Sequence, residues 1–326
     1  MTLRCAAGLR PGAGGKHRKV ISLIETVTIV GMGALGILYG NALSRHLGAD
    51  RVRFLAAGER LARYRQAEVL CNGEPCPFRF TDGSDGPADL LLFAVKGTDL
   101  EQAMDEAAPC VGEDTVILSV LNGVSSEELL SLRFGPEKVL YSVAQGMDAV
   151  RQRTSLTYTN QGVLFLGLPE EDYFDRGEKL EAVYTLFRDA GVTVEKEADI
   201  LHRMWCKFML NVGVNQVCMA YDCDYGGVQA PGQARETMIA AMDEARKVGA
   251  CQGVLVTRKD LQDYLAVLDG LDPKAMPSMR QDSLAHRPSE VELFAGAVCR
   301  LAQQYGMQTP VNEALQEKIR EIETNW

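Results

Sequence analysis

Short apolar runs alternate with segments of helical spacing along the first part of the 326-residue chain. The runs "TVTIV", "RVRFL", "LLLFAVK" and "TVILSV" are each followed by a segment rich in helix-forming residues. Strands of a parallel sheet appear as continuous apolar runs, because helices cover both of its faces. The pattern predicts an α/β domain over residues 25–198, with a hairpin inserted at Asn72-Gly73 in "EVLCNGEPCPFRF".

The pattern changes after Asp199, where helical periods replace the short runs. We predict an all-α domain over residues 199–326. Its first helix includes "MWCKFMLNVGVNQVCMA", in which Lys207, Asn211 and Asn215 are four residues apart and form one polar stripe. A helix that is apolar nearly all round is buried, and a buried lysine is costly unless it is paired. The stripe is expected to line a cleft between the domains. The alternative is an interhelical hydrogen-bond network from which Lys207 reaches the surface.

The first apolar run leads into a glycine-rich turn, "IVGMGALG", and then into a helical segment. In a strand, G-x-G-x-x-G, helix unit the glycines allow a tight turn, close approach of a pyrophosphate and helix packing. The helix N-terminus adds free N–H groups that favour phosphate. We therefore predict a dinucleotide-binding domain of the Rossmann type, rather than a glycine turn with no ligand. The residues expected to contact the cofactor are Gly31, Met32, Gly33, Ala34, Leu35 and Gly36.

The end of the second strand bears on the choice of cofactor, because an acidic residue there suits NAD and a basic one suits NADP. The sequence is "FLAAGERLARYR", with Ala57 at the tip, Glu59 next and Arg60 after it. Arginine matches the oxygens of a 2'-phosphate, so NADP (NADPH) is favoured with Arg60 as its contact, while Glu59 leaves NAD open. Arg63 and Arg65 fit a solvated helix face equally well.

Polar residues end the next two apolar runs. Lys96 follows "LLLFAV", and Asn122 follows "ILSVL". Ligands of open parallel sheets bind beyond the carboxyl ends of the strands. Lys96 and Asn122 are thus expected where cofactor and substrate meet.

Composition and charge exclude several classes of function. The formal net charge is -10, which opposes a nucleic-acid or anionic-membrane partner. Residues 1–24 form a basic, glycine-rich leader that we expect to be flexible, and Glu25 interrupts the apolar run that a signal peptide would need. Nine cysteines without a C-x-x-C pair suit reduced thiols in a cytoplasmic protein. Four histidines without H-x-x-x-H spacing predict no metal site.

The ordered motifs "IVGMGALG", "AVKGTD", "VLNGVSSEE", "WCKFMLNVGVN" and "SMRQD" with "SEVELFAG" resemble the ketopantoate reductase (2-dehydropantoate 2-reductase) family. The resemblance runs from about residue 26 to the C-terminus. It implies a Rossmann domain followed by an all-helical domain, with NADPH bound between them. The implied activity is reduction of the 2-keto acid ketopantoate to pantoate, a step of pantothenate and coenzyme A biosynthesis.

The resemblance also implies roles for individual residues. The catalytic lysine of the family falls on Lys207 and its glutamate on Glu290, although an acid there can also serve only as a dipole partner of the following helix, as we expect for Glu292. Lys207 would polarise the keto oxygen and donate a proton to it, helped by an apolar setting that lowers its pKa. The residues expected to bind the substrate are Lys96, Asn122, Lys207, Asn211, Asn215, Ser278 and Glu290.

Three positions depart from the pattern of the family. Ala57 stands where an arginine is frequent in the family, Gln216 where a proline is frequent, and Tyr225 where the family places an asparagine near the substrate's hydroxyl end. These departures keep open a related reductase of another 2-keto acid or an opine-type dehydrogenase. A non-catalytic NADP-binding sensor is a further alternative, which retention of Lys207 and Glu290 disfavours. A homodimer also stays open.

Overall fold

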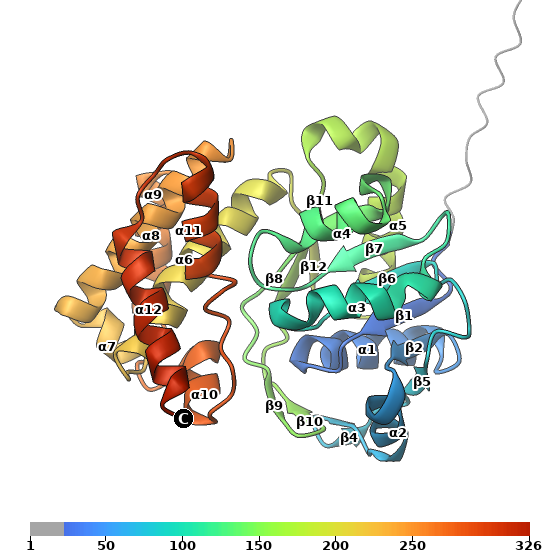
Figure 1. Cartoon of the computed structure of the whole chain (residues 1–326). Helices are drawn as coiled ribbons and strands as arrows, with labels where there is room; N and C mark the ends of the chain where they lie inside the picture. The colour runs from blue at the N-terminus through green and yellow to red at the C-terminus, as the bar shows by residue number, and fades with distance from the viewer. Residues whose placement is uncertain (1–22) are drawn as a thin grey trace, which may run out of the picture.

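The computed structural model describes residues 23–326, which form a sheet-containing lobe and a helical lobe side by side (Figure 1). Of the predicted leader only two residues belong to the described part: Leu23 is exposed, and Ile24 is buried in the core. The basic residues of the leader lie outside it. Among the helices of residues 23–326, none has both the length and the apolar character needed to cross a membrane.

The sheet has eight strands in the order β12–β11–β8–β7–β6–β1–β2–β5. Six of them, from β8 to β5, run parallel, as the apolar runs predicted. β11 pairs antiparallel with β8, and β12 follows the direction of β11. The reversal arises because a hairpin and not a helix connects β8 to β11, and a parallel pair needs a crossover. The strands are β1 (Val27–Val30), β2 (Val52–Leu55), β5 (Arg79–Thr81), β6 (Leu90–Phe93), β7 (Val116–Ser119), β8 (Val139–Gln145), β11 (Val163–Gly167) and β12 (Val194–Lys196).

Helices cover both faces of this sheet. Apolar side chains of α1 and α5 pack on one face, and those of α3 and α4 pack on the other (Figure 1). Two apolar layers of this kind explain why β1, β6 and β7 consist entirely of buried residues. The helices of this lobe are α1 (Ala34–Leu47), α2 (Gly58–Gln66), α3 (Leu100–Ala107), α4 (Ser126–Phe134) and α5 (Tyr173–Asp189), with short turns η1 (Gly97–Asp99), η2 (Ala108–Cys110), η3 (Pro136–Lys138) and η4 (Glu170–Asp172).

A second, four-stranded sheet contains the predicted hairpin. β3 and β4 pair antiparallel around Asn72 and Gly73, whose φ angles are 49° and 83°. A two-residue turn with both φ values positive matches the right-handed twist of the strands, which is why Asn-Gly favours hairpins. The prediction is confirmed. The strands are β3 (Leu70–Cys71), β4 (Glu74–Pro75), β9 (Val150–Gln152) and β10 (Ser155–Thr157), in the order β4–β3–β10–β9.

The helical lobe is built around α6, whose residues are mostly buried. α6 packs on α8, α10 and α12, and its first part also contacts β8. It therefore belongs to the core of the helical lobe and touches the sheet as well. The domain boundary that we propose after residue 198 falls between β12 and α6. The helices are α6 (Ile200–Ala220), α7 (Tyr225–Gln229), α8 (Gln233–Cys251), α9 (Arg258–Asp269), α10 (Ser278–Leu284), α11 (Ala295–Gln304) and α12 (Pro310–Thr324).

Candidate active site

The polar stripe of α6 lies where the two lobes meet. The side chain of Asn215 donates a hydrogen bond to that of Asn211 over 3.3 Å, so these two neighbours share one face of the helix. Lys207, one turn earlier, reaches the sheet lobe. Helical spacing alone explains the alignment. The stripe thus extends from the sheet lobe into the helical lobe.

Lys207 contacts two neutral oxygens of the sheet lobe. Its Nζ donates to Oδ1 of Asn122 over 3.0 Å and to the backbone carbonyl of Ala144 over 2.7 Å. Loss of water around the ammonium lowers the pKa of Lys207 to about 8, and the carboxylates of Glu290 and Glu127 act against this shift. A lysine with such a pKa gives up its proton more readily than an exposed one.

Asn122 links Lys207 to Glu290. While its Oδ1 accepts from Lys207, its Nδ2 donates to Oε2 of Glu290 over 3.3 Å. Glu290 is buried, and burial raises the pKa of its carboxyl. The structure therefore brings together three of the predicted site residues, although Asn122 and Glu290 are separated by 168 positions in the sequence.

Lys96 joins the end of the sheet to α10. Its Nζ donates to Oδ2 of Asp282 over 3.0 Å and to the carbonyl of Pro288 over 3.1 Å. Asp282 is buried, and its Oδ1 accepts from Nε of Arg287. Asp282 was not among the predicted site residues, although "SMRQD" contains it.

Ser278 lies at the far end of the stripe. Its Oγ and the backbone N–H of Met279 both donate to Oδ1 of Asn215, over 3.0 and 3.2 Å. The N-terminus of α10 is thereby attached to α6. Ser278 itself is exposed, so its hydroxyl stays accessible to a ligand.

Gln216 faces away from the stripe. Its Nε2 donates to the carbonyl of Val212 and to Oδ1 of Asn312, and its Oε1 accepts from the N–H of Ala295. The residue is completely buried and connects α6 to α11 and α12. This departure from the family pattern therefore concerns core packing and not the site.

The glycine-rich turn has the shape that a dinucleotide requires. Gly31 has a φ of 104°, and a Cβ there would lie 2.5 Å from the carbonyl oxygen of Ala94. A Cβ at Gly36 would lie 2.1 Å from the carbonyl oxygen of Gly31. At Gly33 a Cβ would lie 3.5 Å from the carbonyl oxygen of Ala94, an ordinary contact distance, so the packing of the protein does not itself require a glycine there. α1 begins directly afterwards, with Gly33 at its N-cap. The turn fits a pyrophosphate at the helix N-terminus.

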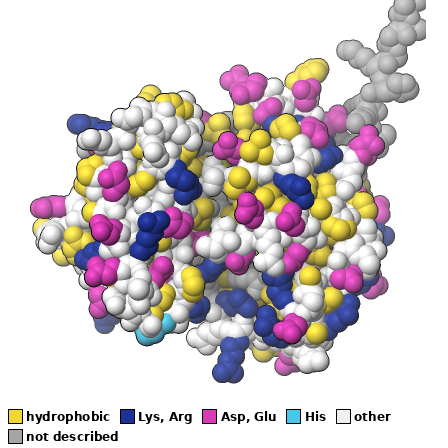
Figure 2. Space-filling view, viewed as in Figure 1, with side chains coloured by type: hydrophobic (Ala, Val, Ile, Leu, Met, Phe, Trp, Pro, Cys, Tyr) yellow, Lys and Arg dark blue, Asp and Glu magenta, His cyan; other side chains and the backbone are white. Residues whose placement is uncertain are grey.

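Arg60 lines a small pocket next to this turn. The pocket is bounded by Gly31, by Leu55 at the end of β2 and by Tyr64 of α2. The guanidinium of Arg60 forms an ion pair with Glu106. Arg60 is thus close to the place where the adenosine of a dinucleotide would lie. A 2'-phosphate bound there would share the Arg60 guanidinium with the carboxylate of Glu106. Figure 2 shows several Lys and Arg side chains near the lower junction of the lobes.

Two models of known families match most of the chain. The model described as "Ketopantoate reductase PanE/ApbA" matches residues 27–170, and that described as "Ketopantoate reductase PanE/ApbA C terminal" matches residues 199–323. The chain belongs to the ketopantoate reductase family. This is a family of oxidoreductases, and ketopantoate reductases use NADPH.

Relatives of this ketopantoate reductase family member match over nearly their whole length. The 2-dehydropantoate 2-reductase of Vibrio cholerae is 26% identical over 307 residues, covering 92% of this chain and 98% of the relative. That of Archaeoglobus fulgidus is 29% identical over 304 residues, covering 92% and 99%. The structure of 2-dehydropantoate 2-reductase from Geobacter metallireducens matches with a TM-score of 0.78 and 25% identity over 91% of this chain and 99% of that one.

A D-mandelate dehydrogenase, solved with NADH and anilino(oxo)acetate, has the same fold. It matches with a TM-score of 0.79 and 20% identity, over 92% of this chain and 98% of that one. The two-lobed fold therefore occurs in dehydrogenases that are named for different substrates. Membership of the ketopantoate reductase family therefore does not determine which keto acid is the substrate, because this depends on the residues that line the site.

Glu127 is a buried acid near the site that the sequence analysis did not single out. It occupies the first turn of α4, and its Oε2 accepts from the hydroxyl of Ser126 over 2.8 Å. Burial raises its pKa to about 7. The available signal was its spacing, because Glu127 precedes the buried Leu130 by three residues and so shares its inward face.

Glu127→Gln is expected to remove part of the pH dependence of stability. Between its ordinary pKa of 4.5 and the folded value of about 7, the unfolded chain loses a proton that the folded chain keeps. The free energy of unfolding therefore falls as pH rises through this window, by about 3 kcal/mol for this group. Urea unfolding should show that, between pH 4.5 and pH 8, the free energy of unfolding of the variant rises by about 3 kcal/mol relative to that of the wild type. Glu128→Gln, at an exposed neighbour, is the control, and equal slopes in Glu127→Gln and wild type would contradict the expectation.

Proposed function

We propose that this protein reduces 2-dehydropantoate (ketopantoate) to pantoate with NADPH. The observation that carries the proposal is the linked set Lys207, Asn122 and Glu290, in which a partly buried ammonium with a pKa of about 8 donates hydrogen bonds only to neutral oxygens. Reduction of a keto group creates negative charge on its oxygen, and such an ammonium can neutralise that charge.

The proposed chemistry begins with binding of the keto acid along the α6 stripe. Bound NADPH supplies the hydride for the keto carbon. Lys207 keeps its hydrogen bond to Asn122 and turns from the Ala144 carbonyl to the keto oxygen, where it stabilises the developing charge and donates a proton. Groups that are already oriented before the reaction stabilise such charge better than water does. Asn122 holds Lys207 in place through the hydrogen bond already present.

The remaining polar groups would orient the substrate. Asn211 and Asn215 offer amide groups on the same stripe as Lys207 for the keto and hydroxyl oxygens, and Ser278 at the end of the stripe would bind the carboxylate. Glu290 would accept a hydrogen bond from a substrate hydroxyl. Lys96, which now binds Asp282, would bridge cofactor and substrate. Ketopantoate carries a carboxylate, a keto group and a hydroxyl, so each of these groups would have a partner.

A panel of 2-keto acids tested with NADPH and with NADH is the experiment that decides the function. We expect the highest kcat/KM for ketopantoate with NADPH. A higher value for an aromatic keto acid such as phenylglyoxylate would replace the proposed substrate, and no turnover with any keto acid would refute the reductase itself. The second candidate, a reductase of another 2-keto acid, is favoured by Tyr225, whose ring is partly buried against the core of the helical lobe.

Arg60→Ala is expected to raise the KM for NADPH about tenfold and to leave the KM for NADH nearly unchanged. The reason is that a guanidinium paired with a 2'-phosphate contributes on the order of 1.5–3 kcal/mol, and NADH lacks this group. Steady-state kinetics with both cofactors measure the difference. Arg63→Ala, in an exposed position of the same helix, serves as the matched control. An equal effect of Arg60→Ala on both cofactors would exclude the 2'-phosphate contact.

A further inference from the structure

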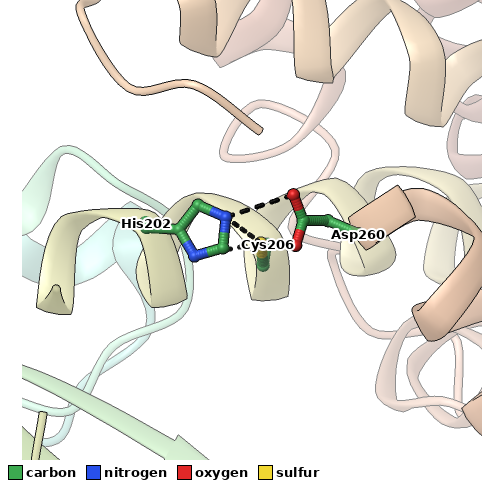
Figure 3. A group of neighbouring side chains, drawn as sticks. All are labelled: His202, Cys206 and Asp260. Atoms are coloured by element: carbon green, nitrogen blue, oxygen red, sulfur yellow. Dashed lines mark hydrogen bonds and ion pairs between the residues drawn. The ribbon is translucent and has the colours of Figure 1, made fainter. Parts of the chain in front are cut away.

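Three side chains with metal-binding atoms converge on a flank of α6. His202 and Cys206 are one helical turn apart and therefore share a face of α6. Asp260 reaches toward them from the first turn of α9 (Figure 3). One ligand atom from each residue lies within 4.8 Å of the other two. The proposed reductase chemistry uses none of the three.

The two distances from the His202 imidazole fit a tetrahedral ion. Nε2 of His202 is 3.2 Å from Oδ2 of Asp260 and 3.5 Å from Sγ of Cys206. Zinc binds nitrogen, oxygen and sulfur at about 2.0–2.3 Å, which places neighbouring ligand atoms of a tetrahedron about 3.4–3.6 Å apart. Both distances from Nε2 of His202 already lie within a few tenths of an ångström of these values, and the carboxylate oxygen of Asp260 lies within 4.8 Å of Sγ of Cys206. A shift of about one ångström or less, within the reach of side-chain rotation, would bring all three atoms onto one ion.

The surroundings also suit a resident ion. The backbone N–H and the hydroxyl of Thr257 both donate to Oδ2 of Asp260, over 2.7 and 2.6 Å, and this capping box holds the carboxylate in place. Oδ1 of Asp260 stays available as a further ligand atom. Cys206 is buried, whereas the side chains of His202 and Asp260 keep 33% and 21% of their exposure, which leaves room for a water molecule.

We propose that His202, Cys206 and Asp260 bind a thiophilic divalent cation, Zn²⁺, with water as its fourth ligand. Imidazole, thiolate and carboxylate together favour zinc over magnesium or calcium, which prefer oxygen ligands. Binding would displace the thiol proton of Cys206. The ion would connect α6, the helix that carries Lys207, to α9. This site is independent of the proposed reductase activity.

The test uses the full chain, stripped of metal by a chelator and titrated with Zn²⁺ alone by calorimetry. We expect one ion per chain, and a rise in Tm of about 5 °C at a hundredfold excess over Kd. Co²⁺ should produce a thiolate-to-metal charge-transfer band. His202→Gln and Cys206→Ala should each weaken zinc binding by at least about 100-fold, because each removes a direct ligand.

Two matched variants separate this site from adventitious binding. His46→Gln and Cys251→Ala change exposed residues of the same types elsewhere and should bind zinc like wild type. His202 is partly exposed, so His202→Gln keeps the test valid even where Cys206→Ala fails to fold. Zinc binding that is absent in wild type, or unchanged in both His202→Gln and Cys206→Ala, would overturn the proposal. A cobalt complex without the charge-transfer band would overturn it as well.

Discussion

Lys207→Ala is expected to lower kcat for ketopantoate reduction about 10³-fold while cofactor binding stays at the wild-type level. Lys207 is the ammonium that contacts neutral oxygens at the junction of the lobes, and loss of a proton donor and charge stabiliser costs on the order of 10²–10⁴ in rate. NADPH consumption measures the first quantity, and fluorescence titration with NADPH measures the second.

The control for this variant is Lys247→Ala, which removes an exposed lysine of α8. It should leave kcat unchanged. Lys207→Met keeps the length of the side chain without its charge and should be as inactive as Lys207→Ala, which separates lost chemistry from a packing defect. Turnover near the wild-type value in either Lys207 variant would remove this residue from the mechanism.

Glu290→Gln is expected to reduce kcat/KM for ketopantoate by about 30-fold, the loss that follows when a charged hydrogen bond of about 3 kcal/mol is replaced by a neutral one of about 1 kcal/mol. Its carboxylate is buried and accepts from Asn122, so its charge acts on both the substrate and the Lys207 contact. Steady-state kinetics with ketopantoate give the value.

Glu292→Gln is the matched comparison. This acid lies two residues further along, is exposed, and forms its ion pair with Arg320 rather than with the site. We expect its kcat/KM to stay within twofold of wild type. Equal losses in the two variants would indicate that the segment, and not the Glu290 carboxylate, matters for activity.

Much of the fold could be predicted because the patterns that encode it are local. Continuous apolar runs such as that of β6 predict strands covered on both faces, and Asn72-Gly73 specifies its hairpin through two backbone angles. The antiparallel pairing of β11 with β8 could not be predicted, because it depends on how the chain returns after β9 and β10. No single segment contains that information.

The site shows the same limit. The spacing of Lys207, Asn211 and Asn215 predicts their stripe, since four residues make about one helical turn. Their partners are different: the bond between Lys96 and Asp282 joins residues 186 positions apart, and Asp260 meets His202 only after α6 and α9 have packed together. Contacts of this kind are properties of the tertiary structure. The orientation of Gln216 also had to be observed.

The ion pair between Lys96 and Asp282 reduces the net free energy of binding for a ligand that replaces Asp282, because the ion pair has to be broken first. The contacts seen in a bound complex would not reveal this loss. A phosphate or carboxylate that binds Lys96 in place of Asp282 has to displace a buried carboxylate that Arg287 also holds. The binding free energy of such a ligand is therefore reduced by the free energy needed to separate Lys96 from Asp282. Selectivity benefits from such an exchange, because only a ligand that offers Lys96 a complete replacement recovers this energy.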